Sequence, residues 1–124
     1  MITAAEDFGA PARDHLDHPR NVGPFPDNEA GEISSGEAGS SASGSFVRFH
    51  LRVAAGRIEA VRYEVLGKPA LIAASSCLSE LLVGGPAIPG AVPPGLEIAR
   101  ALGLPRAEHG AALLAEDAAL AALR

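Results

Sequence analysis

Two stretches in the middle of the chain alternate apolar and polar residues with a period of two. Over residues 45–53 the apolar positions are Val47, Phe49, Leu51 and Val53, and over residues 58–66 they include Val61, Tyr63 and Val65. A period of two is typical of strands that bury one face. Only Ala54–Arg57 separates the two stretches, and its Gly56 can adopt the left-handed conformation of a tight turn. The pattern predicts an antiparallel hairpin of strands 45–53 and 58–66.

After the second strand, the period changes to that of a helix. Apolar residues recur at helical spacing over Pro69–Val83, where Pro69 suits a first helical turn and the following Gly84-Gly85-Pro86 ends the helix. Leu96–Leu102 predicts a short helix, and Arg106–Leu123 predicts a final one.

The segment before the hairpin is less regular. Residues 13–18 predict a short helix that ends before Pro19, and Glu32–Ser35 allow a short first strand. The run of small residues from Gly36 to Gly44 predicts a loop at the entrance of the hairpin.

Strands followed by helices predict an α+β fold, in which a small antiparallel sheet packs against the C-terminal helices. The length of 124 residues suits one domain, which we assign to residues 13–124. Residues 1–12 show no periodicity and contain the helix breakers Gly9 and Pro11. We therefore expect a mobile N-terminal lead-in there.

Composition excludes several classes of function. The net charge of −5 and the lack of a basic stripe argue against nucleic-acid binding. No run of about 18 apolar residues is present, and the N-terminus shows no apolar signal segment, so we expect no membrane association. The single cysteine excludes an internal disulfide and fits a reducing cytoplasm. The richness in Ala, Gly, Pro and Arg fits a bacterial source.

Few side chains are arranged for chemistry. His15 and His18 are spaced to share a helix face and hold a metal ion, but a solvated polar helix end is the favoured interpretation. Ser43 and Lys68 could form a nucleophile pair, yet the sequence shows no oxyanion hole and no S-x-x-K spacing, so a small loop residue and a surface lysine are favoured. Cys77, inside a predicted helix, is expected to be a half-buried apolar residue and not a reactive thiol.

The order of three motifs resembles a known family. The motifs are "DHLDHPRNVG" at residues 14–23, "IAASS" at residues 72–76 followed by Glu80, and "LAEDA" at residues 114–118. Together they resemble the iron–sulfur cluster assembly scaffolds, the IscU type that is also called the NifU N-terminal domain. The resemblance covers residues 13–123 and implies the scaffold fold.

The resemblance also implies a ligand site, and the ligands are missing. The family holds a nascent cluster, or zinc, with cysteines helped by an aspartate and a histidine. In this chain the corresponding positions are Ser43, Ser45, Lys68, Gly110 and Ala111. Serine hydroxyls are poor ligands for thiophilic metals, and Lys68 would place a cation where the metal ion would sit. We therefore expect no metal and no cofactor here.

Partners are implied by two further segments. The family docks to a cysteine desulfurase near the N-terminus, and the motif residues retained here are His15, Pro19, Arg20, Asn21 and Gly23. The segment that a dedicated chaperone reads in the family is altered in this chain, because Leu104–Glu108 has an acidic residue at the lysine position. We expect contact with a cysteine desulfurase or a cluster-acceptor protein.

Three hypotheses about function follow. The first is a non-catalytic binding or regulatory protein, not an enzyme, in cytoplasmic iron–sulfur cluster assembly. The second is a scaffold that binds iron or a cluster through substitute ligands such as His15, His18 or His109. The third is a new small-molecule or catalytic role in the vacated pocket, built from Ser43, Ser45 and Lys68. Function depends on the site and not on the fold, so the loss of every ligand favours the first hypothesis.

Overall fold

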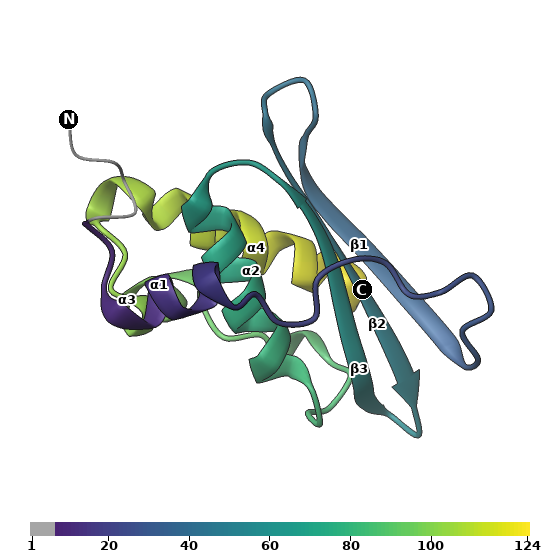
Figure 1. The fold of residues 1–124 in the computed structure, drawn as a ribbon. Coiled ribbons are helices and arrows are strands. Elements are labelled where there is room, and N and C mark those ends of the chain that lie inside the picture. Colours follow the sequence, from purple (N-terminus) through teal and green to yellow (C-terminus); the bar gives the residue numbers. More distant parts are fainter. Residues whose placement is uncertain (1–6) are drawn as a thin grey trace.

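The computed structural model describes residues 7–124, which form one sheet and a set of helices (Figure 1). The α-helices are α1 (Ala10–Asp17), α2 (Pro69–Leu82), α3 (Gly95–Leu102) and α4 (His109–Ala122). The strands are β1 (Glu32–Ser40), β2 (Ser45–Ala54) and β3 (Arg57–Leu66). They form a 3-stranded antiparallel sheet in the order β1-β2-β3. The predicted α+β fold is confirmed.

The predicted hairpin of β2 and β3 is present. The two strands pair along their whole length, with one irregularity between Arg52 and Val53. The turn that joins them contains two left-handed residues, Ala55 at φ 51° and Gly56 at φ 74°. Two consecutive left-handed residues give a turn whose twist matches that of the flanking strands. The glycine therefore serves the role that the sequence indicated.

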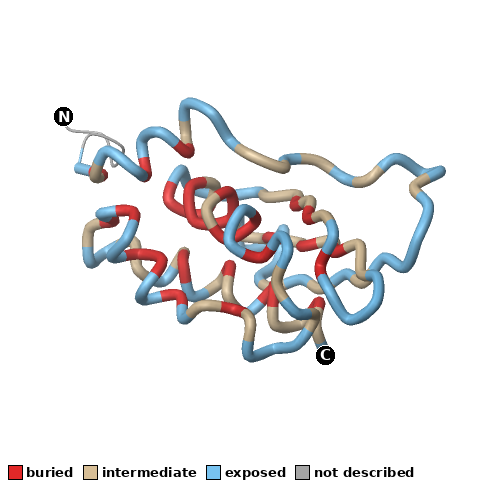
Figure 2. The backbone as a smooth tube through the Cα atoms, turned by 90° about the horizontal axis from the view of Figure 1, so that it is seen from below, coloured by how far each residue is buried: buried red, intermediate tan, exposed pale blue. Residues whose placement is uncertain are grey.

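The helices cover one face of the sheet and leave the other face to solvent (Figure 1). α2 packs on β3, α4 packs on β1 and β2, and α3 contacts both of these helices. Large buried side chains come from both layers, among them Phe49, Leu51, Ile58, Tyr63, Leu71, Leu78, Leu82, Ile98 and Leu102. In Figure 2 many buried residues gather on α2, whereas the segment between α1 and β1 is mostly exposed. α2 is therefore the central helix of the core.

Small residues let α4 approach β1 closely. The buried positions of α4 are all alanines: Ala112, Ala115, Ala118, Ala119 and Ala122. A Cβ at Gly36 of β1 would lie 2.1 Å from the backbone nitrogen of Ala122. No side chain fits at that distance, so strand and helix meet backbone to backbone. The Ser34 hydroxyl donates a hydrogen bond to the carbonyl oxygen of Ala122 and fixes the contact.

The first strand is longer than predicted. The run of small residues that was expected to be a loop continues β1 as far as Ser40, and only Ser41–Gly44 forms the turn to β2. Glycines weaken a strand in isolation, but pairing with β2 and packing against α4 outweigh that preference here. The first strand predicted at Glu32–Ser35 is thus corrected to Glu32–Ser40.

The lead-in predicted for residues 1–12 is wrong over its second part. Pro11 does not break structure but lies in the first turn of α1, where a missing backbone N–H costs nothing. Phe8 and Ala12 are buried in the core. Residues 1–6, the rest of the predicted lead-in, lie outside the described residues.

The C-terminal helices follow their predicted ranges closely. The helix expected to begin at Arg106 starts as a 3₁₀ turn and becomes α-helical at His109. Within the described part of the chain, no helix is both long enough and apolar enough to cross a membrane.

Gly36→Ala is expected to lower the free energy of unfolding by about 3 kcal/mol, because the new Cβ would overlap backbone atoms of α4 that cannot rotate away. Gly110→Ala is the matched control, since nothing lies within 4 Å of a Cβ at Gly110 and a helix favours alanine. Urea unfolding measures both variants. Equal stabilities for the two variants would contradict the close approach of α4 to β1.

Candidate functional site

One depression is lined by most of the positions that correspond to the family's ligands. Ser45 at the start of β2, Lys68 before α2, and Gly110 and Ala111 in the first turn of α4 surround a cavity of about 280 Å³. The other lining residues are Leu71, Ala107, Glu108 and Leu114. We call this cavity the α2–α4 pocket, because both helices begin at it.

The α2–α4 pocket offers two opposite charges and a hydroxyl group. Lys68 is exposed and Glu108 is half-buried. Within the described residues, neither forms an ion pair with the other or with any other side chain. Lys68 is therefore not a buried ammonium that requires a partner. The described lining residues include no thiolate and no imidazole, the ligands that zinc and iron–sulfur clusters prefer.

Ser43 does not line the α2–α4 pocket, because its hydroxyl is used within its own turn. The Ser43 hydroxyl donates a hydrogen bond to the carbonyl oxygen of Ser40 at 2.9 Å. The Ser43 N–H donates to the Ser40 hydroxyl at 3.2 Å, and the Ser45 N–H donates to the Ser43 hydroxyl at 3.4 Å. The structure thus brings Ser45 and Lys68 to one cavity and leaves Ser43 outside it.

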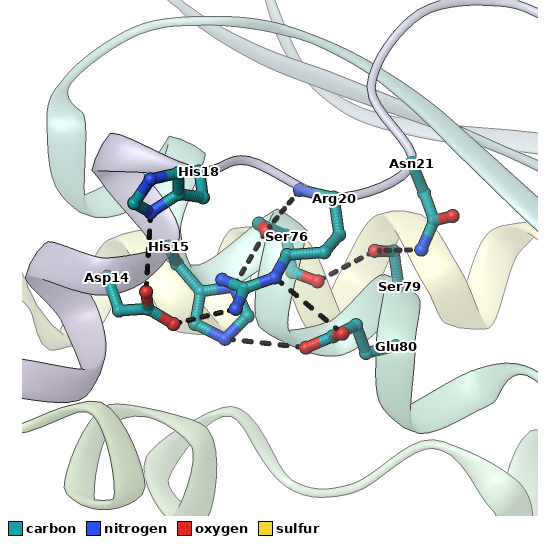
Figure 3. Close-up of polar contacts among 8 residues, drawn as sticks. All are labelled: Asp14, His15, His18, Arg20, Asn21, Ser76, Ser79 and Glu80. Atoms are coloured by element: carbon teal, nitrogen blue, oxygen red, sulfur yellow. Dashed lines mark hydrogen bonds and ion pairs between the residues drawn. The ribbon is translucent and has the colours of Figure 1, made fainter.

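A second group of polar residues fastens the N-terminal segment to α2 (Figure 3). The Nδ1 atom of His15 lies 2.7 Å from the Oγ atom of Ser76, which also accepts the backbone N–H of Arg20 at 2.9 Å. The side-chain amide of Asn21 donates to the Oγ atom of Ser79 at 3.0 Å. We call these contacts of His15, Arg20 and Asn21 with α2 the N-terminal clamp.

The same segment covers part of the outer edge of β3. The Tyr63 N–H donates to the carbonyl oxygen of Asn21 at 3.2 Å, and the Gly23 N–H donates to the carbonyl oxygen of Tyr63 at 2.8 Å. Asn21 has φ 59° and Gly23 has φ 100°. Asparagine and glycine adopt such left-handed conformations at the lowest cost. These two motif residues therefore have a structural role in closing the sheet edge.

Ion pairs surround the N-terminal clamp at the surface (Figure 3). The Arg20 guanidinium lies 2.6 Å from a carboxylate oxygen of Asp14 and 3.7 Å from one of Glu80. Its hydrogen bond holds the pKa of Asp14 below its usual value. The Nε2 atom of His15 lies 3.7 Å from Glu80, but burial and the nearby Arg20 charge lower the pKa of His15. The neutral imidazole is thus the favoured form in the folded protein.

The sequence favoured a solvated helix end for His15, and that interpretation is wrong. Only 11% of the His15 side chain is exposed, whereas 77% of the His18 side chain is. The signal that the prediction missed is the pair Ser76 and Ser79, which lie among the buried positions of α2. Buried hydroxyls need hydrogen-bond partners, and the N-terminal segment supplies those of Ser76. The Ser79 hydroxyl accepts from Asn21 and donates to the carbonyl oxygen of Ser76 within α2. Among the described residues the buried Ser75 hydroxyl has no partner.

The histidines and the cysteine do not assemble a metal site in residues 7–124. No group of three His, Cys, Asp or Glu side chains there could hold an ion. The Nε2 atom of His109 lies 3.2 Å from the carbonyl oxygen of Leu104, just before α4. Cys77 is half-buried, as predicted, and burial followed by the Glu80 charge raises the pKa of its thiol. A protonated thiol is a poor nucleophile.

The solvent face of the sheet carries a hydrogen-bonded chain that the sequence did not indicate. The Oγ atom of Ser35 lies 2.7 Å from Nδ1 of His50, and Nε2 of His50 lies 2.7 Å from a carboxylate oxygen of Glu64. These residue types also form catalytic relays, but Ser35 is exposed on an open strand. We assign the chain to cross-strand stabilisation, since it links β1, β2 and β3.

Comparison with known proteins agrees with the fold. The family model of the NifU-like N terminal domain matches residues 10–124. The iron-sulfur cluster assembly scaffold protein IscU of Escherichia coli K12 is 35% identical over 111 residues, which are 89% of this chain and 86% of that protein. The bifunctional protein NifU/MnmA of Rubrobacter xylanophilus is 41% identical over 112 residues, which cover 87% of this chain and 22% of that protein.

A mitochondrial relative and a solved structure extend the comparison. Iron sulfur cluster assembly protein 1, mitochondrial, of Eremothecium gossypii is 35% identical over 113 residues, or 90% of this chain and 73% of that protein. The crystal structure of a nitrogen-fixing NifU-like protein (N-terminal) from Brucella abortus has a TM-score of 0.61 at 20% identity and covers 89% of this chain and 87% of that one. The fold is thus that of a cluster-assembly scaffold domain. This chain belongs to the NifU-like N-terminal domain family.

The folded protein is expected to lose stability as the pH falls below about 6.5, the usual pKa of histidine. The pKa of His15 is lowered on folding, so in this range the unfolded chain binds a proton that the folded chain does not. The stabilisation that the neutral His15 provides is fully present above the usual pKa of the unfolded chain. It is lost as the pH falls from that value towards the lowered pKa of the folded state.

His15→Gln should flatten the dependence of the free energy of unfolding on pH below about pH 6.5, relative to the unmodified chain. Denaturant unfolding at a series of pH values measures both proteins. An identical slope in the unmodified chain and His15→Gln would show that His15 is not the group responsible.

Proposed function

We propose that this chain is a non-catalytic binding protein of iron–sulfur cluster assembly, which acts in a bacterial cytoplasm and contacts a cysteine desulfurase or a cluster acceptor without carrying a cluster. One observation carries the proposal. The residues at four of the ligand positions line the α2–α4 pocket, but they are Ser45, Lys68, Gly110 and Ala111. The fold of a scaffold is complete while its ligand chemistry is missing.

The chemistry of the α2–α4 pocket supports this proposal. A cluster or a structural zinc ion needs several thiolates or imidazoles that converge on one point. The pocket offers the hydroxyl of Ser45, the carboxylate of Glu108 and the ammonium of Lys68. A hydroxyl and one carboxylate are hard ligands, and the ammonium repels a metal cation.

The N-terminal segment supports the docking part of the proposal. His15, Arg20 and Asn21 form the clamp, so their contribution to docking is to hold the segment in shape. The side chains left for a partner are those that point outward. Pro19 is exposed, and the Val22 side chain is 50% exposed. An exposed apolar residue on a rigidly held segment suits a contact point for another protein.

Calorimetric titration against the cysteine desulfurase of the same host tests the proposal directly. We expect saturable binding, and Val22→Asp should weaken it at least about tenfold by placing a charge in an apolar contact. Ile88→Asp is the matched control, since Ile88 is 54% exposed but lies on the connector between α2 and α3. If the unmodified chain binds neither the desulfurase nor any cluster acceptor, the proposed role is refuted.

Restoring the ligands should create a zinc site. The variant Ser43→Cys, Ser45→Asp, Lys68→Cys, Ala111→Cys should bind zinc, because structural zinc binding contributes about 10–16 kcal/mol. The hydrogen bonds lost from the Ser43 turn cost only about 1 kcal/mol each.

Competition with a zinc indicator and cobalt absorbance measure the restored site. The matched control is Ser43→Ala, Ser45→Ala, Lys68→Met, Ala111→Ser, which changes the same positions without adding ligands and should bind no zinc. If the ligand-bearing variant folds and still binds none, these positions do not converge on one site.

A further inference from the structure

The α2–α4 pocket holds two opposite charges that do not neutralise each other. Lys68 and Glu108 both line it, and among the described residues neither has an ion-pair partner. The lining also includes the apolar residues Leu71, Ala111 and Leu114. A cavity with a separate cation, a separate anion and an apolar wall is complementary to a small ligand that carries the same three features.

We propose that the α2–α4 pocket binds a free α-amino acid with an apolar side chain. The ligand's carboxylate pairs with the Lys68 ammonium and accepts a hydrogen bond from the Ser45 hydroxyl. Its ammonium pairs with the Glu108 carboxylate, and its side chain lies against Leu71 and Leu114. Charge-assisted hydrogen bonds at both ends fix the orientation of the ligand, and burial of its side chain supplies the affinity.

The size and charge of the pocket argue against other ligand classes. Its volume of about 280 Å³ lies just below the range of about 300–1,000 Å³ typical of pockets for drug-sized ligands, so a nucleotide is too large. Glu108 repels a simple anion, and Lys68 repels a simple cation or a metal ion. A zwitterion satisfies both groups at once.

The beginning of α2 at the pocket favours the same orientation. The positive end of its helix dipole lies beside Lys68, the N-cap residue, and adds to the attraction for the carboxylate of the ligand. Glu108 is the N-cap residue of α4, so its negative charge offsets the positive end of that helix where the ammonium group of the ligand binds.

This inference goes beyond the proposed role in cluster assembly and fails independently of it. Desulfurase binding tests the outer surface of the N-terminal segment around Val22. Amino-acid binding tests the α2–α4 pocket between β2 and the starts of α2 and α4.

Calorimetric titration with L-leucine and L-methionine is the test, with N-acetyl-L-leucine and L-leucinamide as matched probes that each lack one charge. We expect at least one of the two amino acids to bind, and both derivatives of leucine to bind at least tenfold more weakly than leucine or not at all. Binding of neither amino acid would overturn the proposal. So would derivatives that bind as tightly as L-leucine.

Two variants assign the charges to residues. Lys68→Met and Glu108→Gln should each weaken amino-acid binding at least tenfold. Among residues 7–124 neither side chain forms an ion pair, so we expect the fold to tolerate both changes. Arg106→Gln is the control, an exposed neighbour that does not line the pocket. Circular dichroism confirms that each variant is folded. Unchanged affinity in folded Lys68→Met and Glu108→Gln would overturn the proposal.

Discussion

The backbone contact between α4 and Gly36 is the constraint on which the architecture depends. Alanines on α4 and a glycine on β1 let the helix lie against the strand with no side chain between them. This short distance between helix and sheet also fixes the position of the first turn of α4, because a helix is rigid over its length. That turn carries Gly110 and Ala111 to the α2–α4 pocket. A larger residue at Gly36 would displace the helix and change the pocket at its far end.

The N-terminal clamp holds the segment after α1 on α2 through polar contacts. The segment after α1 buries little apolar surface, and hydrogen bonds to Ser76 and Ser79 hold it on α2. A single hydrogen bond contributes only about 1 kcal/mol net, but a buried hydroxyl without a partner costs more than that. Ser76, whose hydroxyl contacts His15 and the backbone N–H of Arg20, therefore specifies the position of the segment. A rigid segment with an outward apolar side chain such as Val22 is also a well-prepared surface for a partner.

What the sequence could predict depends on the range of the interaction involved. The hairpin and α2 were predicted correctly because alternation and helical spacing are local signals. β1 was predicted too short, because glycine is unfavourable in a strand by itself and Gly36 is required only by the close approach of α4. The motif order placed Ser45 and Lys68 at one site, but the sequence could not show that Glu108 joins them or that Ser43 turns away. The position of Glu108 depends on the path of the chain between α3 and α4. That of Ser43 depends on the hydrogen bonds within the turn between β1 and β2.

The turn at Ser43 has an evolutionary consequence. Its hydroxyl and N–H form hydrogen bonds with Ser40, and the hydroxyl also accepts one from the backbone of Ser45. A cysteine there would form these bonds weakly, because a thiol is a poor donor and acceptor. A single reversion would thus loosen the turn without creating a metal site, since the other positions would still lack ligands. Taken alone, Ser43→Cys would therefore cost stability and bring no metal binding in return.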